Sequence, residues 1–101
     1  MPVRTRIAVG GFSDEEAAGG IPSLRKELEG RAWLRVIELS WDTKRKRIVV
    51  VAQMDGDDPR IEGGVGGAIY DNIWDCVFAT MPSNDSDWTF DVEESSCVAA
   101  A

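Results

Sequence analysis

The sequence predicts a ferredoxin-like α+β fold, in which a four-stranded antiparallel sheet carries two helices on one face. Segments that alternate apolar and polar residues, as strands do, are interrupted twice by segments with helical spacing. The resulting order is strand, helix, strand, strand, helix, strand. A length of 101 residues suits one domain. We place that domain at residues 1–94 and expect residues 95–101 to be a frayed tail.

The first strand is expected at residues 3–9, where apolar or β-branched residues occupy every second position until Gly10 and Gly11. Ser13, followed three residues later by Glu16, predicts a capping box. Apolar residues then recur every three or four positions as far as Gly30, which is a natural helix stop. The sequence leaves open whether this helix breaks at Pro22.

Residues 32–41 are rich in aromatic and β-branched types and predict a second strand. A polar turn follows at residues 42–45, and the next strand is expected at residues 46–54. Its centre, residues 48–52, is apolar on both faces, as is typical of a central strand. In the second strand, alternation places four residues on one face: Trp33, Ile37, Leu39 and Trp41.

The second helix is expected from about Pro59 to Thr80, because Asp58 suits a capping position and proline suits the first helical position. Apolar residues spaced four apart from Ile61 to Val77 mark its buried face. The last strand begins near Trp88, where apolar and acidic residues alternate.

The sheet is predicted to carry apolar side chains on the face that lacks helices. Leu34 and Val36 oppose Trp33 and Ile37, and residues 48–52 are apolar on both sides. Exposed apolar patches of a few hundred Å² or more usually mark interfaces. We therefore expect a homodimer packed through its sheets, or a small-molecule pocket between them. The candidate interface or ligand residues are Trp33, Trp41, Leu34, Val36 and Trp88.

Charge is distributed unevenly along the chain. Residues 1–54 carry ten Lys and Arg against seven Asp and Glu, whereas residues 55–101 carry one against eleven. A pI near 4.4 opposes binding to nucleic acids or anionic membranes and favours a basic protein as partner. The acidic face that would bind this partner consists of Asp85, Asp87, Asp91 and Glu93. The basic run of residues 44–47 is interpreted as a solvated hairpin tip.

The glycine cluster Gly63, Gly64, Gly66 and Gly67 conflicts with a helix interior, where each glycine costs about 1 kcal/mol relative to alanine. Three explanations remain open: the helix starts later, near Gly67, the helix packs closely against a neighbour, or backbone N–H groups cradle an anion. The cradle is the least favoured, because carboxylates surround the cluster and no P-loop Lys or Ser/Thr follows it.

Several kinds of chemistry are excluded or unsupported. The chain has no histidine, which removes histidine-based nucleophile activation, general bases and metal ligands. Asp55, Asp57 and Asp58 do not match a calcium loop, and Cys76 and Cys97 lack the spacing of a zinc or redox motif. We expect no metal, no cofactor and two reduced thiols. The longest apolar run, residues 48–52, cannot span a bilayer, and no signal segment is recognised, so a cytoplasmic protein is expected.

Three functions are compatible with these observations. The leading hypothesis is a non-enzymatic module that self-associates through its sheet face and binds a protein or small ligand there. The alternative is an acidic inhibitor, of the immunity-protein type, that blocks a basic partner such as a nuclease. A third hypothesis is a small enzyme that uses Asp71 and Asp75, which lie four residues apart on one helical face.

Overall fold

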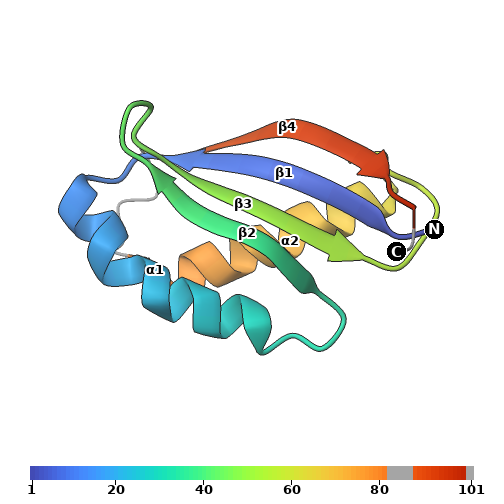
Figure 1. Ribbon diagram of the computed structural model, residues 1–101, viewed down its shortest axis with the longest axis horizontal. Helices are drawn as coiled ribbons and strands as arrows, with labels where there is room; N and C mark the ends of the chain where they lie inside the picture. Colours follow the sequence, from blue (N-terminus) through green and yellow to red (C-terminus); the bar gives the residue numbers. More distant parts are fainter. Residues whose placement is uncertain (82–87, 100–101) are drawn as a thin grey trace.

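The computed structural model describes residues 1–81 and 88–99 and confirms the ferredoxin-like α+β fold (Figure 1). Neighbouring strands are all antiparallel, in the order β2-β3-β1-β4. Both helices lie below the sheet in Figure 1 and leave its other face open. The elements are β1 (Val3–Gly10), α1 (Asp14–Glu29), β2 (Arg35–Asp42), β3 (Arg47–Met54), α2 (Val65–Thr80) and β4 (Thr89–Cys97).

The hydrophobic core lies between the sheet and the two helices. The central strands β1 and β3 supply the fully buried Ile7 and Val50, and the helices supply Leu24 and Ile73. Each of these residues belongs to an apolar series with the period of its own element, two in strands and close to four in helices. The predicted periodicity therefore locates the core correctly.

The capping box at the start of α1 is confirmed. The Glu16 backbone N–H donates to Ser13 Oγ (3.1 Å), and the Ser13 N–H donates to Glu16 Oε1 (2.9 Å). The helix does not break at Pro22, which is exposed. Leu24 and Leu28, which follow Pro22 in the sequence, are buried in the core. Their packing holds the second half of the helix in line with the capped first half.

Helix α2 begins at Val65, six residues later than predicted. The preceding segment folds back over the helix start instead of joining it. Its carbonyl groups accept hydrogen bonds there, Asp58 O from the Val65 N–H (2.7 Å) and Arg60 O from the Gly67 N–H (3.2 Å). The Asp58 carboxylate accepts the Arg60 backbone N–H (3.0 Å) rather than capping the helix as expected.

The predicted common face of the second strand is wrong, because β2 contains a bulge. Val36 pairs with Ala52 and Leu39 pairs with Val50, and both residues face the helices. In a regular strand one residue would separate them, but here two do, which is the mark of a bulge. Ile37 lies within the bulge and is 38% exposed. Trp33 precedes the strand altogether, since β2 starts at Arg35.

Strand β4 continues beyond the point where fraying was expected. Ser95 pairs with Thr5 and Cys97 pairs with Val3, so residues 95–97 belong to the sheet. The buried hydroxyl of Thr5 lies 3.1 Å from Ser95 Oγ, and Ser95 Oγ donates to Pro59 O (2.6 Å). These contacts tie the end of the strand to the loop that precedes α2.

Candidate functional site

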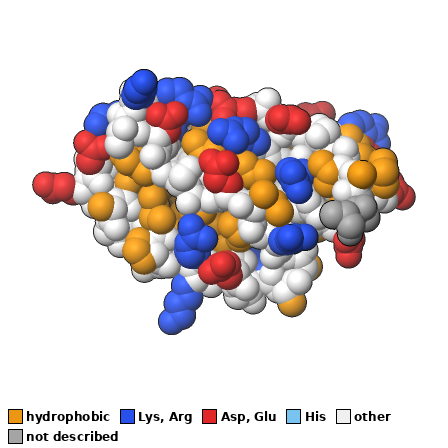
Figure 2. Space-filling model, viewed as in Figure 1, with side chains coloured by type: hydrophobic (Ala, Val, Ile, Leu, Met, Phe, Trp, Pro, Cys, Tyr) orange, Lys and Arg blue, Asp and Glu red, His pale blue; other side chains and the backbone are white. Residues whose placement is uncertain are grey.

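The open face of the sheet is mainly charged rather than apolar. Its central apolar residues, Ala8, Val49 and Val51, are no more than 7% exposed, because long polar side chains from neighbouring positions lie over them. Figure 2 shows Lys and Arg side chains interspersed with Asp and Glu along the sheet side of the molecule, at the top of the view. The apolar side chains expected on this face are present, but except for Ile37, which is 38% exposed, they are covered.

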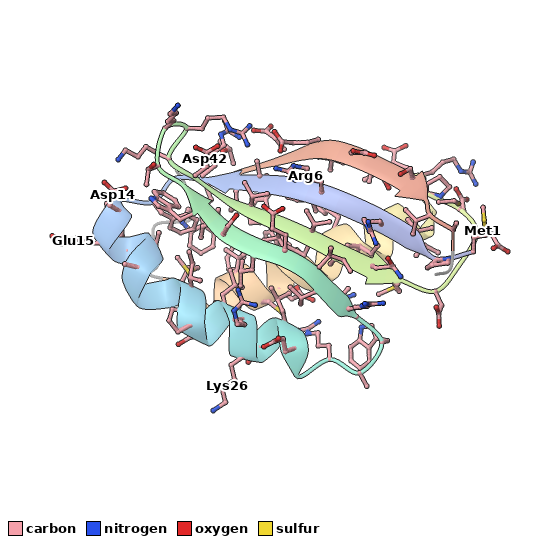
Figure 3. All side chains as sticks on the ribbon, viewed as in Figure 1. Met1, Arg6, Asp14, Glu15, Lys26 and Asp42 are labelled. Atoms are coloured by element: carbon pink, nitrogen blue, oxygen red, sulfur yellow. The ribbon has the colours of Figure 1, made fainter. Side chains whose placement is uncertain are left out.

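Ion pairs connect all four strands across this face. Arg6, which Figure 3 shows on β1, lies 3.2 Å from Glu93 and 3.6 Å from Glu38, nitrogen to oxygen. Arg45 contacts the second oxygen of Glu93 (2.7 Å), and Arg47 pairs with Asp91. The hydrogen bond from Arg45 is the main reason why the pKa of the Glu93 carboxyl is below its usual value.

In the basic hairpin tip, Arg45, Lys46 and Arg47 each form an ion pair with a carboxylate of the same molecule. The tip is therefore not simply solvated, as the sequence had suggested it would be. Lys46 Nζ lies 2.7 Å from Asp14 Oδ2, at the start of α1 beside the hairpin (Figure 3). The Asp14 Oδ1 atom accepts the indole N–H of Trp41 (2.8 Å). These bonds lower the pKa of Asp14, with the bond from Lys46 contributing most.

The predicted acidic face is only partly available to a partner. Asp91 and Glu93 lie on the open sheet face and are paired there with arginines. Asp85 and Asp87 lie outside the described residues. The two strand carboxylates therefore hold the sheet and hairpin together, a role that their alternation with apolar residues did not reveal.

A shallow hollow of about 290 Å³ lies on the open face, where a small-molecule pocket was expected. Its walls include Arg4, Arg6, Glu38 and Glu94, beside the apolar side chain of Val51. Arg4 donates to Gln53 Oε1 (3.0 Å). Because cations and anions line the hollow together, a simple ion of either sign gains little net attraction there.

The candidate interface residues do not form one surface. Leu34 is buried in the core, and Val36 and Trp41 pack against it on the helix side of the sheet. Trp33 is 59% exposed in the loop before β2, where its indole N–H donates to Asn72 Oδ1 (3.0 Å). Only Trp88 lies beside other partly exposed aromatic residues.

Those aromatic residues lie between α2 and β4. The rings of Trp74 and Phe78 stack with centroids 3.9 Å apart, and their residues are 38% and 39% exposed. The Phe78 ring contacts Trp88 at 4.9 Å, and the Trp74 ring lies 6.1 Å from Phe90. We call Tyr70, Trp74, Phe78, Trp88 and Phe90 the aromatic surface; Tyr70 joins it through a 6.0 Å contact with Phe90.

The charge beside the aromatic surface is acidic. Asp71 and Asp75 are exposed, and helical spacing places them on the same side of α2 as Trp74 and Phe78. No Lys or Arg follows Arg60 in the sequence. Within residues 1–81 and 88–99, neither carboxylate forms an ion pair.

The sequence pointed to Trp88 as an interface candidate but not to Trp74 or Phe78. A usable signal was present in the predicted helix. Its buried face contains Ile69, Ile73 and Val77, and Trp74 and Phe78 each follow one of these residues by one position. A rotation of about 100° per residue carries both aromatics towards solvent.

The glycine cluster is explained by close packing and a late helix start. Gly63 has a positive φ of 77°, and Gly64, Gly66 and Gly67 lie against backbone atoms of residues 58–61, where a Cβ atom would clash. The amides of Val65 and Gly67 are already bonded to the chain's own carbonyl groups. The anion-cradle explanation is therefore wrong for these two amides.

The described residues also give little basis for metal or carboxylate chemistry. They contain no group of three His, Cys, Asp or Glu side chains placed to hold a metal ion. Asp57 pairs with the N-terminal ammonium group (2.9 Å), and Asp58 pairs with Arg60 (2.6 Å). Asp71 lines a hollow at the start of α2, but Asp75 is not among its lining residues.

Comparison with known proteins found no match: no family model, no curated protein and no solved structure is significantly similar to this chain. In the part of the chain that the structure describes, no helix has both the length and the apolar character needed to cross a membrane.

Proposed function

We propose that this protein is a non-enzymatic interaction module that binds a basic protein through its aromatic surface. The observation that carries the proposal is the exposed Trp74–Phe78 pair, which lies beside carboxylates on a helix without Lys or Arg. An inhibitor of a basic enzyme, the alternative suggested by the sequence, is one form that this function takes.

Two physical arguments support the aromatic surface as the binding site. Large aromatic side chains dominate the energy of protein interfaces, and tryptophan is enriched among the residues that contribute most. Trp74 and Phe78 are each more than one-third exposed, and their rings are in contact on one face of the helix. Such a pair is the kind of anchor that a partner would cover.

The neighbouring charge favours a basic partner over a second copy of this chain. A twofold dimer through the aromatic surface would bring Asp71 and Asp75 of each copy close to those of the other. Like charges in such an interface oppose association, whereas Lys and Arg on a partner would be attracted. The net charge of −7 acts in the same direction at longer range.

Self-association through the open sheet face is a second candidate, favoured by one observation. Ile37 is 38% exposed beside the covered valines of that face. A partner packed there would have to desolvate the ion pairs around Arg6 and Arg47, which costs free energy unless each charge finds a new partner. The aromatic surface avoids this cost.

A peptide-display selection tests the proposal. The wild-type chain is used as bait for random twelve-residue peptides, and the Trp74→Ala/Phe78→Ala double variant is used for counter-selection. We expect the retained peptides to be rich in Lys and Arg and to bind less tightly at high salt. Trp33→Ala, which removes an exposed tryptophan outside the aromatic surface, should keep the binding.

Two results would contradict the proposal. One is a set of peptides without cationic enrichment, and the other is binding that survives in the double variant with its fold intact by circular dichroism. Light scattering on the same samples tests the second candidate. A dimer whose mass is independent of salt would shift the assignment to the open sheet face.

A further inference from the structure

Asp71, Trp74 and Asp75 are exposed residues on one side of α2. Asp71 lies three residues before Trp74 and four before Asp75, so its side chain neighbours both, whereas Trp74 and Asp75 are consecutive and point about 100° apart. Like charges four residues apart destabilise a helix, and in the described part of the chain neither carboxylate forms an ion pair, although Arg31 donates to the nearby Asn72 (2.7 Å). A cation supplied by a partner would therefore relieve the repulsion between these two carboxylates.

The indole of Trp74 has limited space for a ligand. The Phe78 ring lies 3.9 Å away at an interplanar angle of 32°, so it covers one side of the indole. Phe90 lies farther away, with 6.1 Å between ring centroids. Since Trp74 is 38% exposed, the accessible part is the remaining face and edge of the ring.

A guanidinium group fits this environment better than an ammonium group. It is planar and weakly hydrated, so it stacks on an aromatic face while its N–H groups donate to carboxylates in its own plane. A lysine ammonium is compact and strongly hydrated, and therefore gains less from stacking.

We infer that the basic partner anchors an arginine here, with its guanidinium stacked on Trp74 and hydrogen-bonded to Asp71 and Asp75. This inference rests on the proposed function and specifies its recognition chemistry. If it is correct, the surface prefers arginine to lysine; a surface that attracted any positive charge would bind both equally.

The test compares two peptides of equal length and charge, (Arg-Gly)4 and (Lys-Gly)4, by calorimetry and by NMR of the tryptophan indole N–H groups. We expect the arginine peptide to bind about fivefold more tightly, which corresponds to one cation–π contact. The Trp74 signal, assigned by its loss in Trp74→Leu, should shift on binding. The signal of Trp41, whose indole N–H donates to Asp14, should not.

Variants locate the preference. Trp74→Leu keeps an apolar side chain and should remove the difference between the two peptides. Asp71→Asn/Asp75→Asn should weaken binding of the arginine peptide about tenfold, in line with the loss of charge-assisted hydrogen bonds. Glu62→Gln, which removes an exposed loop carboxylate, should leave the arginine preference unchanged.

The possible failures are distinguishable. Equal affinity of the two peptides, with binding still dependent on Trp74, would overturn the arginine inference and leave the proposed function standing. Arginine-peptide binding that Trp74→Leu does not alter would overturn the inference by placing the site elsewhere. Self-association of the wild-type chain that Trp74→Leu abolishes would also overturn it, by making a second copy the occupant.

Discussion

Gly19 and Gly67 show how the same residue type serves different purposes in the two helices. An added Cβ atom at Gly19 would meet no neighbouring atom within 4 Å, whereas one at Gly67 would clash with the carbonyl oxygen of Ile61. Gly67 is therefore required by packing, and Gly19 is not. Only the requirement for glycine at position 67 depends on residues outside the helix.

Alanine substitutions at these positions should have opposite effects on stability. Gly19→Ala should raise the free energy of unfolding by about 0.5–1 kcal/mol, because alanine loses less backbone entropy in a helix. Gly67→Ala should lower it by about 1–3 kcal/mol, because the Ile61 backbone must move. Urea denaturation of both variants checks this, and a stabilising Gly67→Ala substitution would contradict the packing explanation.

At the same scale, residue patterns predicted the contacts made within a few positions. The capping box of Ser13 and Glu16 needs only four consecutive residues, and it formed as expected. The ion pair between Arg45 and Glu93 joins residues 48 positions apart and was not predicted. The residue pattern around Arg45 does not indicate where Glu93 will lie, and the pattern around Glu93 does not indicate where Arg45 will lie.

At the scale of elements, the boundaries that moved are those set by neighbouring segments. Helix α2 starts late because carbonyl groups of residues 58–60 occupy amides of its first turn. Strand β4 ends late because β1 offers a hydrogen-bonding edge as far as Val3. The spacing of apolar residues correctly indicated whether each element is a helix or a strand. It did not indicate where contacts with neighbouring segments would make α2 begin or β4 end.

Truncation tests the extension of β4. Deleting residues 95–101 removes the pairs formed by Ser95 and Cys97 and should lower the free energy of unfolding by about 2 kcal/mol or more, at about 1 kcal/mol for each hydrogen bond lost. Deleting residues 99–101 leaves β4 intact and should change stability little. Thermal and urea unfolding measure both, and equal stability of the two truncated chains would show that residues 95–98 contribute nothing.

At the scale of the whole molecule, ion pairs link the hairpin to α1 and to the sheet. Four carboxyls have pKa values lowered chiefly by hydrogen bonds from Lys or Arg: Asp14, Asp42, Asp58 and Glu93. A carboxyl with a lowered pKa in the folded state stabilises the fold above its unfolded pKa. That stability is lost as the pH falls through the folded pKa.

Glu93 provides a direct test of this acid sensitivity. Its usual pKa of 4.5 is lowered in the folded protein, chiefly by Arg45, so its contribution should be present above that pH and disappear as the pH falls through the lowered pKa of the folded state. Glu93→Gln should therefore show a shallower loss of stability as the pH falls, and so should Arg45→Gln. Urea unfolding at several pH values measures the slope, with Glu62→Gln as the control for removing one charge.

The sequence by itself determined the number, type and order of the elements, and with them the fold class. It also named Trp88 as a candidate interface residue, but it did not predict the contact of Trp88 with Phe78. Alternation and helical period report only which side chains of one element share a face. The bulge in β2, the charged cover over Val49 and Val51, and the meeting of Trp74 with Phe90 depend on how elements pair and pack. Only the tertiary structure decided them, because each contact joins segments whose local patterns carry no information about one another.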